Sequence, residues 1–218
     1  MKRLTRGESG LTREEYAVLA RLTTPAKIQD FLDTLAFNWE KGGDTHRSPR
    51  GILAARKAHC IEGALLAATA LWIAGESPLI MNLSPQAGRG DFDHVVALFK
   101  RGGRYGAISK TNHSVLRFRD PIYRTPRELA LSYFHEWFLP KTGEKVLECY
   151  SKPLDLQKRF GTAWVTAEKD LWEVADALDA TPHYDLVPKG NWRFMRNADR
   201  VELAASSAAE WKKSHPRT

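Results

Sequence analysis

Hydrophobic positions in this chain recur mostly at helical spacing, and polar capping residues stand where the helices should start. One start is a capping box, formed by Thr12 with Glu15, and three others pair a capping hydroxyl with a first-turn proline. These signals predict helices that begin after Thr12, Thr24, Ser48 and Thr125. Periodicity alone predicts a further helix over 168–178 and a weaker one over 204–212.

Residues 61–72 differ from the other helical stretches because they are apolar on almost all sides and rich in alanine. A helix of this kind is buried on most faces, and neighbouring elements pack close to its backbone. The sequence from Gly75 to Pro78 ends it. We therefore predict a central buried helix.

Strand-forming sequence follows this helix. A short strand is predicted over 79–83, and after a glycine-rich loop another runs over 95–99. The chain then turns at Gly102-Gly103 and returns over 105–109. The order of helices, central helix and strands predicts an α+β fold, in which the central helix packs on a small antiparallel sheet and additional helices follow towards the C-terminus.

A length of 218 residues suits one substantial core. We predict a single domain over 1–188, with a core at about 24–120 and a helical extension over 121–188. No clear secondary structure is predicted for 146–164. The remaining residues, 189–218, are expected to form a basic, partly helical, solvated tail.

The formal charge is +7, and residues 189–218 contain seven Lys and Arg against three acidic residues. A basic balance is compatible with nucleic acid or with an acidic partner and establishes neither. Because no basic helix with interleaved aromatics and no recognisable nucleic-acid motif occurs, we do not expect direct nucleic-acid binding.

The chain has only two cysteines, Cys60 and Cys149, so neither a disulfide framework nor a metal framework is indicated. The first ten residues lack the apolar core of a secretory signal, and the run 61–74 is too short to cross a bilayer. These features predict a cytoplasmic protein without membrane contact; they leave its oligomeric state open.

Cys60 stands between a basic stretch, 56–59, and the apolar helix. A helix that begins there directs its unpaired N–H groups and positive dipole end at the sulfur, which favours the reactive thiolate. A cysteine beside an apolar run is commonly an inert buried residue. Here the basic flank and His94, on the predicted hairpin, favour a Cys–His pair instead.

Candidates for orienting His94 come from the hairpin. If its turn is centred between residues 101 and 102, Ser109 lies opposite His94, and Asn112 lies just beyond. Both are neutral and would stabilise an imidazolium less than a carboxylate. Asp91 and Asp93 are the acidic alternatives, although Asp93 should point to the other face of the strand.

A cysteine enzyme of this kind also needs donors for an oxyanion. The backbone N–H of Cys60 is the natural oxyanion donor, and the side chains of Asn38 or Trp39 are alternatives. His59 and His113 could join Cys60 and His94 in a zinc site, but no short ligand pair anchors one. We therefore expect neither a metal nor another cofactor.

The residues His59-Cys60-Ile61-Glu62-Gly63-Ala64, followed by Asp93-His94-Val95 and by Gly106-Ala107-Ile108-Ser109, resemble the transglutaminase-like superfamily over about residues 24–112. The resemblance implies a papain-like α+β core and a Cys-His-Asp triad that carries out acyl transfer on amides. It places Cys60 as nucleophile and His94 as base. Ser109 falls where the family usually has Asp, followed by Lys110-Thr111 in place of Pro-Thr.

The expected function is thus that of a cysteine peptidase or amidase, or of an amide acyltransferase, acting on protein or peptide amides. Two alternatives from other classes stay open. The absent Asp would suit a catalytically silent binding module of the same fold. The basic C-terminus would suit a nucleic-acid-associated protein.

Overall fold

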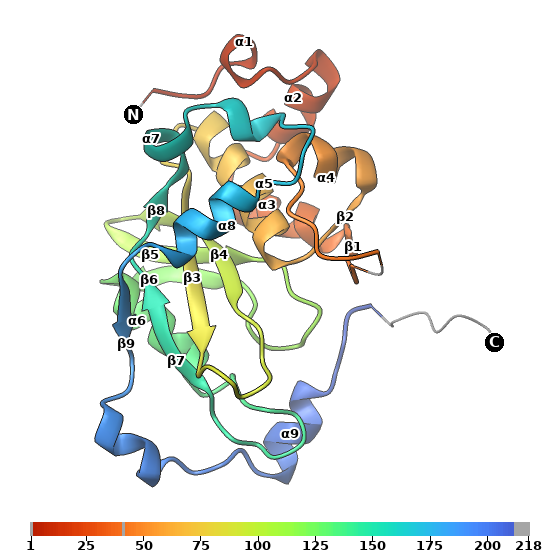
Figure 1. Ribbon diagram of the computed structural model, residues 1–218. Coiled ribbons are helices and arrows are strands. Elements are labelled where there is room, and N and C mark those ends of the chain that lie inside the picture. The colour runs from red at the N-terminus through yellow and green to blue at the C-terminus, as the bar shows by residue number, and fades with distance from the viewer. Residues whose placement is uncertain (1, 41, 212–218) are drawn as a thin grey trace, which may run out of the picture.

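The computed structural model describes residues 2–40 and 42–211, in which an antiparallel sheet of seven strands lies between two groups of helices and loops (Figure 1). The helices are α1 (Arg6–Ser9), α2 (Arg13–Ala20), α3 (Pro25–Asp33), α4 (Pro49–Ala55), α5 (Cys60–Ile73), α6 (Pro126–Phe134), α7 (Leu156–Phe160), α8 (Trp172–Asp179) and α9 (Arg200–Ser206), with short 3₁₀ helices η1 (Ala163–Val165) and η2 (Lys189–Phe194). The strands are β1 (Ala36–Phe37), β2 (Lys57–Ala58), β3 (Leu79–Pro85), β4 (His94–Arg101), β5 (Arg104–Ser109), β6 (Arg119–Tyr123), β7 (Leu147–Ser151), β8 (Leu154–Asp155) and β9 (His183–Asp185).

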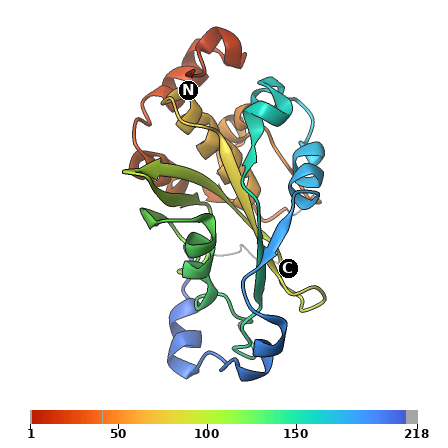
Figure 2. The same cartoon turned by 90° about the vertical axis from the view of Figure 1, so that its left-hand side faces the viewer.

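The strand order in the main sheet is β6-β5-β4-β3-β7-β9, with β8 beside β3, and β1 pairs with β2 as a separate parallel ribbon. The N-terminal helices gather at one end of the sheet and α9 lies at the other (Figures 1 and 2). This arrangement confirms the predicted α+β class with a central helix on an antiparallel sheet.

Strand β4 is apolar without interruption because both faces of the sheet are covered. Val95, Ala97 and Phe99 pack in the cluster that contains α5, whereas Val96 and Leu98 pack in the cluster that contains α6. Alternate residues of a strand point to opposite faces, so such a run needs partners on both sides. Helix α5 is the predicted central helix: every residue from Ile61 to Ile73 is buried.

The predicted helix starts are confirmed. The hydroxyls of Thr12, Thr24, Ser48 and Thr125 each accept a hydrogen bond from the backbone N–H three residues later. Such caps satisfy donors that the first helical turn leaves unpaired.

Helix α8 begins later than the predicted residue 168. The Asp170 carboxylate accepts from the His46 backbone N–H at 2.8 Å, and the Leu171 N–H donates to the His46 carbonyl at 2.7 Å. These contacts tie the preceding segment to a distant loop, so the helix starts only at Trp172.

The prediction of a helical extension over 121–188 needs correction. This segment contains α6, α7 and α8, but it also supplies β7 and β9 to the main sheet and β8 beside β3. The sequence did not predict these strands, because they are short and partly exposed and lack the continuous apolar run of β4.

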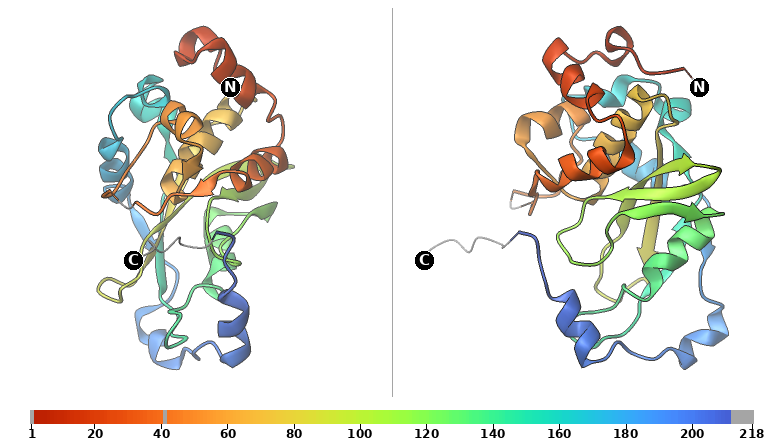
Figure 3. Two further views of the ribbon diagram at one scale, coloured as in Figure 1. Left: turned by 90° about the vertical axis from the view of Figure 1, so that its right-hand side faces the viewer. Right: turned by 180° about the vertical axis from the view of Figure 1, so that it is seen from behind.

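The described part of the predicted tail, 189–211, is mostly exposed and partly helical, with η2 and α9, but it also bonds to other parts of the chain. The Lys145 ammonium donates to the Arg196 carbonyl at 2.7 Å, and the Ala198 N–H donates to the Gly143 carbonyl at 2.7 Å. After α9 the chain rises towards the N-terminal helices, and Ala209 pairs with His113 (Figure 3). Residues 212–218 lie outside the described chain. Among the described residues, no helix is both long and apolar enough to cross a membrane.

Candidate functional site

Cys60 is the first residue of α5 and remains partly exposed, while His59 is the N-cap residue. The predicted placement of the thiol at a helix tip is therefore what the fold produces. The His59 backbone N–H donates to the Glu62 carboxylate at 3.1 Å, which holds the start of the helix in place.

The first turn of α5 lies against the end of β5. A Cβ atom at Gly63 would stand 2.3 Å from the Lys110 Cβ, so only glycine fits there. The Lys110 side chain is buried and its ammonium donates to the Leu35 carbonyl at 2.7 Å. This close approach brings α5 next to the strands that carry His94 and Ser109.

His94 is buried at the start of β4, and its Nε2 lies 2.7 Å from the Ser109 hydroxyl. That hydroxyl donates its own proton to the Leu116 carbonyl at 2.6 Å. Since the proton is used there, the hydroxyl accepts from His94 Nε2–H. The tautomer that follows leaves the lone pair of neutral His94 on Nδ1, the nitrogen free to meet Cys60.

The hairpin register differs from the prediction. Its turn is centred between Gly102 and Gly103, both at positive φ (55° and 74°), and Ser109 pairs with Val96 instead of His94. Two consecutive residues at positive φ form the tight turn that suits a hairpin, and Gly-Gly meets that need. The shift is two residues, so Ser109 keeps its face of the sheet and reaches His94 diagonally.

Two histidines act on the Cys60 thiol. Burial favours the neutral thiol, but side-chain interactions with His59 and His94 outweigh it and lower the pKa of Cys60 to about 5. His59 Nδ1 lies 3.9 Å from Sγ, and the Asp93 carbonyl lies 3.8 Å from it. The sulfur is therefore placed to exist as a thiolate at neutral pH.

His59 is held by oxygen atoms on the side away from the sulfur. Its Nε2 lies 2.7 Å from the Thr45 carbonyl and 3.3 Å from a Glu40 carboxylate oxygen. Burial disfavours its charged form, but the hydrogen bond and charge of Cys60, with Glu62, raise the pKa of His59 to about 9. His59 is thus an imidazolium near neutral pH.

Behind His59, the fully buried Glu62 carboxylate is satisfied by several donors. Arg47 donates from its backbone N–H and its guanidinium, each at 3.2 Å, while the Thr45 hydroxyl donates at 3.0 Å and the Asn38 amide at 3.1 Å. A buried carboxylate needs such partners to remain ionised. The amide of Asn38, predicted as an oxyanion donor, is used here and in a bond to the Thr45 hydroxyl.

The other predicted residues have different partners. The Asn112 side-chain carbonyl accepts from the Trp211 N–H at 2.7 Å, so Ser109 and not Asn112 bonds to His94. Asp91 accepts from the Trp137 indole at 2.8 Å, and Asp93 accepts from the Asn82 amide at 2.6 Å. Neither carboxylate bond goes to His94.

From the sequence, His59 was a candidate only for a zinc site, and no role was predicted for Glu40 or Glu62. One signal was available: a glutamate three residues after an N-cap is the second half of a capping box, which would have marked His59 as the cap. Glu40 offered no signal, because the loop that contains it has no periodicity.

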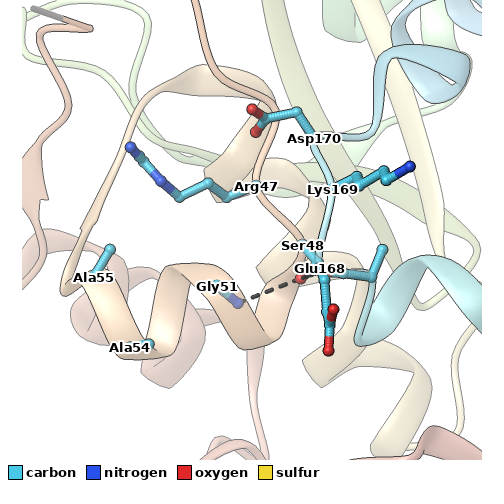
Figure 4. Close-up of a pocket in the computed structure, with 9 residues that line it drawn as sticks. Arg47, Ser48, Gly51, Ala54, Ala55, Glu168, Lys169 and Asp170 are labelled. Carbon is cyan, nitrogen blue, oxygen red and sulfur yellow. Dashed lines mark hydrogen bonds between the residues drawn. The ribbon is translucent and has the colours of Figure 1, made fainter. Parts of the chain in front are cut away.

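Two cavities border this region. One, of about 600 Å³, is lined by the His59 partners Glu40 and Thr45, together with Phe37, Asn38 and Trp39 among others. The other, of about 480 Å³, lies between α4 and residues 167–170, with Arg47 and Asp170 at its edge (Figure 4). Arg47 and Asp170 line both.

No protein-family model matches the sequence, and no curated protein is similar to it. Among solved structures, Legionella pneumophila LapG aligns with 50% of this chain and 75% of its own, at 11% identity and a TM-score of 0.36. Similarity of this degree assigns no family, so function has to be argued from the chain's own residues.

Proposed function

We propose that this protein is a transglutaminase-like cysteine enzyme that acts on amide bonds, as a peptidase, an amidase or an amide acyltransferase. The observation that carries the proposal is a partly exposed cysteine at a helix tip, which interacts with two histidines and has a pKa of about 5. Perturbed thiols of this kind are typical of nucleophiles.

The proposed reaction follows from the positions of Cys60 and His94. The thiol proton passes to His94 Nδ1, and the thiolate attacks the amide carbonyl to form a tetrahedral oxyanion. The Cys60 backbone N–H, in the first turn of α5, is the nearest helical donor for that oxyanion. When the C–N bond breaks, His94 gives its proton to the departing amine.

The thioester is then resolved by water or by a second amine, which attacks the carbonyl as His94 takes its proton. The thiolate leaves and the enzyme returns to its starting state. Ser109 keeps the His94 ring in the required tautomer. Within the described residues, the partner of His94 Nε2 is the Ser109 hydroxyl and not a carboxylate, so Ser109 contributes orientation and little charge stabilisation.

The proposal predicts the pH profile of Cys60 alkylation by iodoacetamide. A thiolate is present only above the thiol pKa, so the rate should stay near its plateau from pH 8 down to 6 and fall to half near pH 5. An ordinary cysteine would show a midpoint at about 8.5. The pH at the midpoint of the profile, and not the plateau rate, is the quantity to compare, because a thiolate of low pKa is intrinsically less nucleophilic.

Cys149 is an internal control for this measurement. It too is partly exposed, but burial raises its pKa to about 11. Peptide mapping by mass spectrometry would follow both cysteines in one sample. A Cys60 midpoint near that of an ordinary thiol would contradict the proposal and favour a catalytically silent binding module.

Ser109→Ala tests the orienting role. Loss of the bond to His94 should lower the rate of peptide-amide hydrolysis by roughly 10- to 100-fold, since general acid–base catalysis contributes on the order of 100-fold or more. The Leu116 carbonyl and the His94 Nε2–H both lose their partner, which should cost about 1–3 kcal/mol of stability for each group that stays unpaired. Ser132 is a matched control, because its hydroxyl makes a similar 2.6 Å bond to a carbonyl, that of Leu129. Wild-type turnover in Ser109→Ala would exclude this role.

A further inference from the structure

The two histidines beside Cys60 differ in the charge of the groups that contact their Nε2 atoms. Behind His94 stands the neutral hydroxyl of Ser109 at 2.7 Å. Behind His59 stand the Thr45 carbonyl and the carboxylate of Glu40, at 2.7 and 3.3 Å. The negative charge that usually supports the histidine of a Cys–His pair is therefore found at the other ring.

We propose that His59 is an imidazolium that keeps its charge through the catalytic cycle, donates its Nδ1–H to the Cys60 sulfur and holds it as thiolate, while His94 alone transfers protons. The inference rests on the proposed function and deepens it, because it assigns the stabilisation of the thiolate to the residue adjacent to the nucleophile.

The hydrogen-bond geometry of His59 fits this role. Its Nε2 faces only acceptors among its contacts in the described chain, namely the Thr45 carbonyl, Glu40 at 3.3 Å and Glu62 at 3.7 Å. Nε2 therefore carries a proton. With Nδ1 also protonated, the ring donates to oxygen on one side and to sulfur, 3.9 Å away, on the other.

The charges of the cluster balance under this assignment. Arg47 pairs with Glu62 at 3.2 Å, His59 pairs with Glu40 at 3.3 Å, and the Cys60 thiolate pairs with His94 after the thiol proton has moved to it. Each buried charge then has a partner of opposite sign, which is the condition for charges to persist in a site of low dielectric constant.

His59 keeps its proton throughout the reaction. The proton that the leaving amine requires comes from the thiol by way of His94, so no proton is needed from His59. Its pKa of about 9 is consistent with a ring that stays charged at neutral pH, where the thiolate is present. Between about pH 5 and pH 9 both members of the pair are ionised.

Several charged or titratable groups surround the ring and enter any pH profile. They are Cys60 and Glu62 on α5, Glu40, His46 and Arg47 in the loop before α4, Asp170 beyond His46, and His94 on β4. The His46 ring lies 6.0 Å from that of His59, and burial lowers its pKa, so it adds no positive charge at neutral pH.

The test is the iodoacetamide profile of Cys60 in His59→Asn. Asparagine keeps an N–H near the Nδ1 position and removes the charge. The midpoint should rise by about 1 to 3 on the pH scale, which is the effect of an opposite charge within contact distance. At pH 9 the labelling rate should reach a plateau again. Because an unfolded chain would also expose an ordinary thiol, the variant must melt within a few degrees of the wild type for the shift to count.

Glu40→Gln is the second variant. It leaves the helix start untouched, removes the charge behind His59 and keeps a side-chain oxygen that can accept from the Thr45 N–H, as the carboxylate does at 2.8 Å. Its midpoint should move in the same direction by a smaller amount. His135→Gln replaces an exposed histidine after α6 and should leave the profile unchanged. The inference is overturned if His59→Asn and Glu40→Gln both give the wild-type profile.

Failure of the inference can be told from failure of the proposed function. A wild-type midpoint near 5 that does not move in either variant rejects the role of His59 and leaves the Cys60–His94 enzyme standing. A wild-type midpoint near 8.5 rejects both.

Discussion

Replacement of Cys60 by alanine is expected to reduce hydrolysis of peptide amides by about 1,000-fold or more, since loss of a nucleophile in such enzymes removes nearly all turnover. No thioester forms without the sulfur, and His94 then has no thiol proton to pass on. The fold should persist, because the residue is partly exposed at the start of α5 and alanine suits a helix. The measurement is amine release from a panel of peptide and glutamine amides.

Cys149→Ser is the matched control for this loss. Cys149 pairs with Ser84 and Asp185 in the sheet register and takes no part in the Cys60 cluster. The control should keep its turnover, and both variants should melt within a few degrees of the wild type. A Cys60→Ala protein that retained more than a tenth of the rate would show that another group performs the chemistry.

Gly63→Ala is expected to lower the free energy of unfolding by about 1–3 kcal/mol, the usual cost of overpacking a filled core. Its Cβ would lie 2.3 Å from the Lys110 Cβ. Lys110 cannot move aside easily, because its backbone follows directly on the last residue of β5 and its ammonium is bonded to the Leu35 carbonyl at 2.7 Å. The gain in helix propensity, about 1 kcal/mol, does not offset the overlap.

Thermal melting measures this effect, and a shift of roughly 3–10 °C is expected for a domain of this size. Gly7 provides a control, because it lies in α1 and nothing stands within 4 Å of its added Cβ. Gly7→Ala should leave the melting temperature unchanged or raise it slightly. A Gly63→Ala protein as stable as this control would mean that α5 and β5 are less tightly packed than described.

Much of the fold could be predicted because its signals are local. The capping residues of α2, α3, α4 and α6 act within one helical turn, and the uninterrupted apolar run of α5 reflects burial on all sides. The later strands were missed because β7, β8 and β9 have two to five residues each, and their pairing depends on partners far along the chain. Pairing between distant segments does not produce a periodic pattern of hydrophobic residues in the sequence.

The same distinction applies to the site. Cys60 and His94 were predicted from their places at the beginnings of a helix and a strand. Ser109 was predicted with the wrong hairpin register, yet it reaches His94, because a shift by two residues preserves the face of the strand. The contacts of Glu40 and Thr45 with His59 arise from a loop that closes over the helix tip, and no spacing rule anticipates them.

His59 and Cys60 are consecutive residues, whereas His94, which also interacts with Cys60, is carried by strand β4 of the sheet. When α5 moves against the sheet, His59 and Cys60 therefore move together, whereas the distance between Cys60 and His94 changes. On gentle heating, the sulfur should keep its acidity at temperatures where proton transfer to the amine has already become inefficient. Alkylation and turnover would then decline at different temperatures in the same sample.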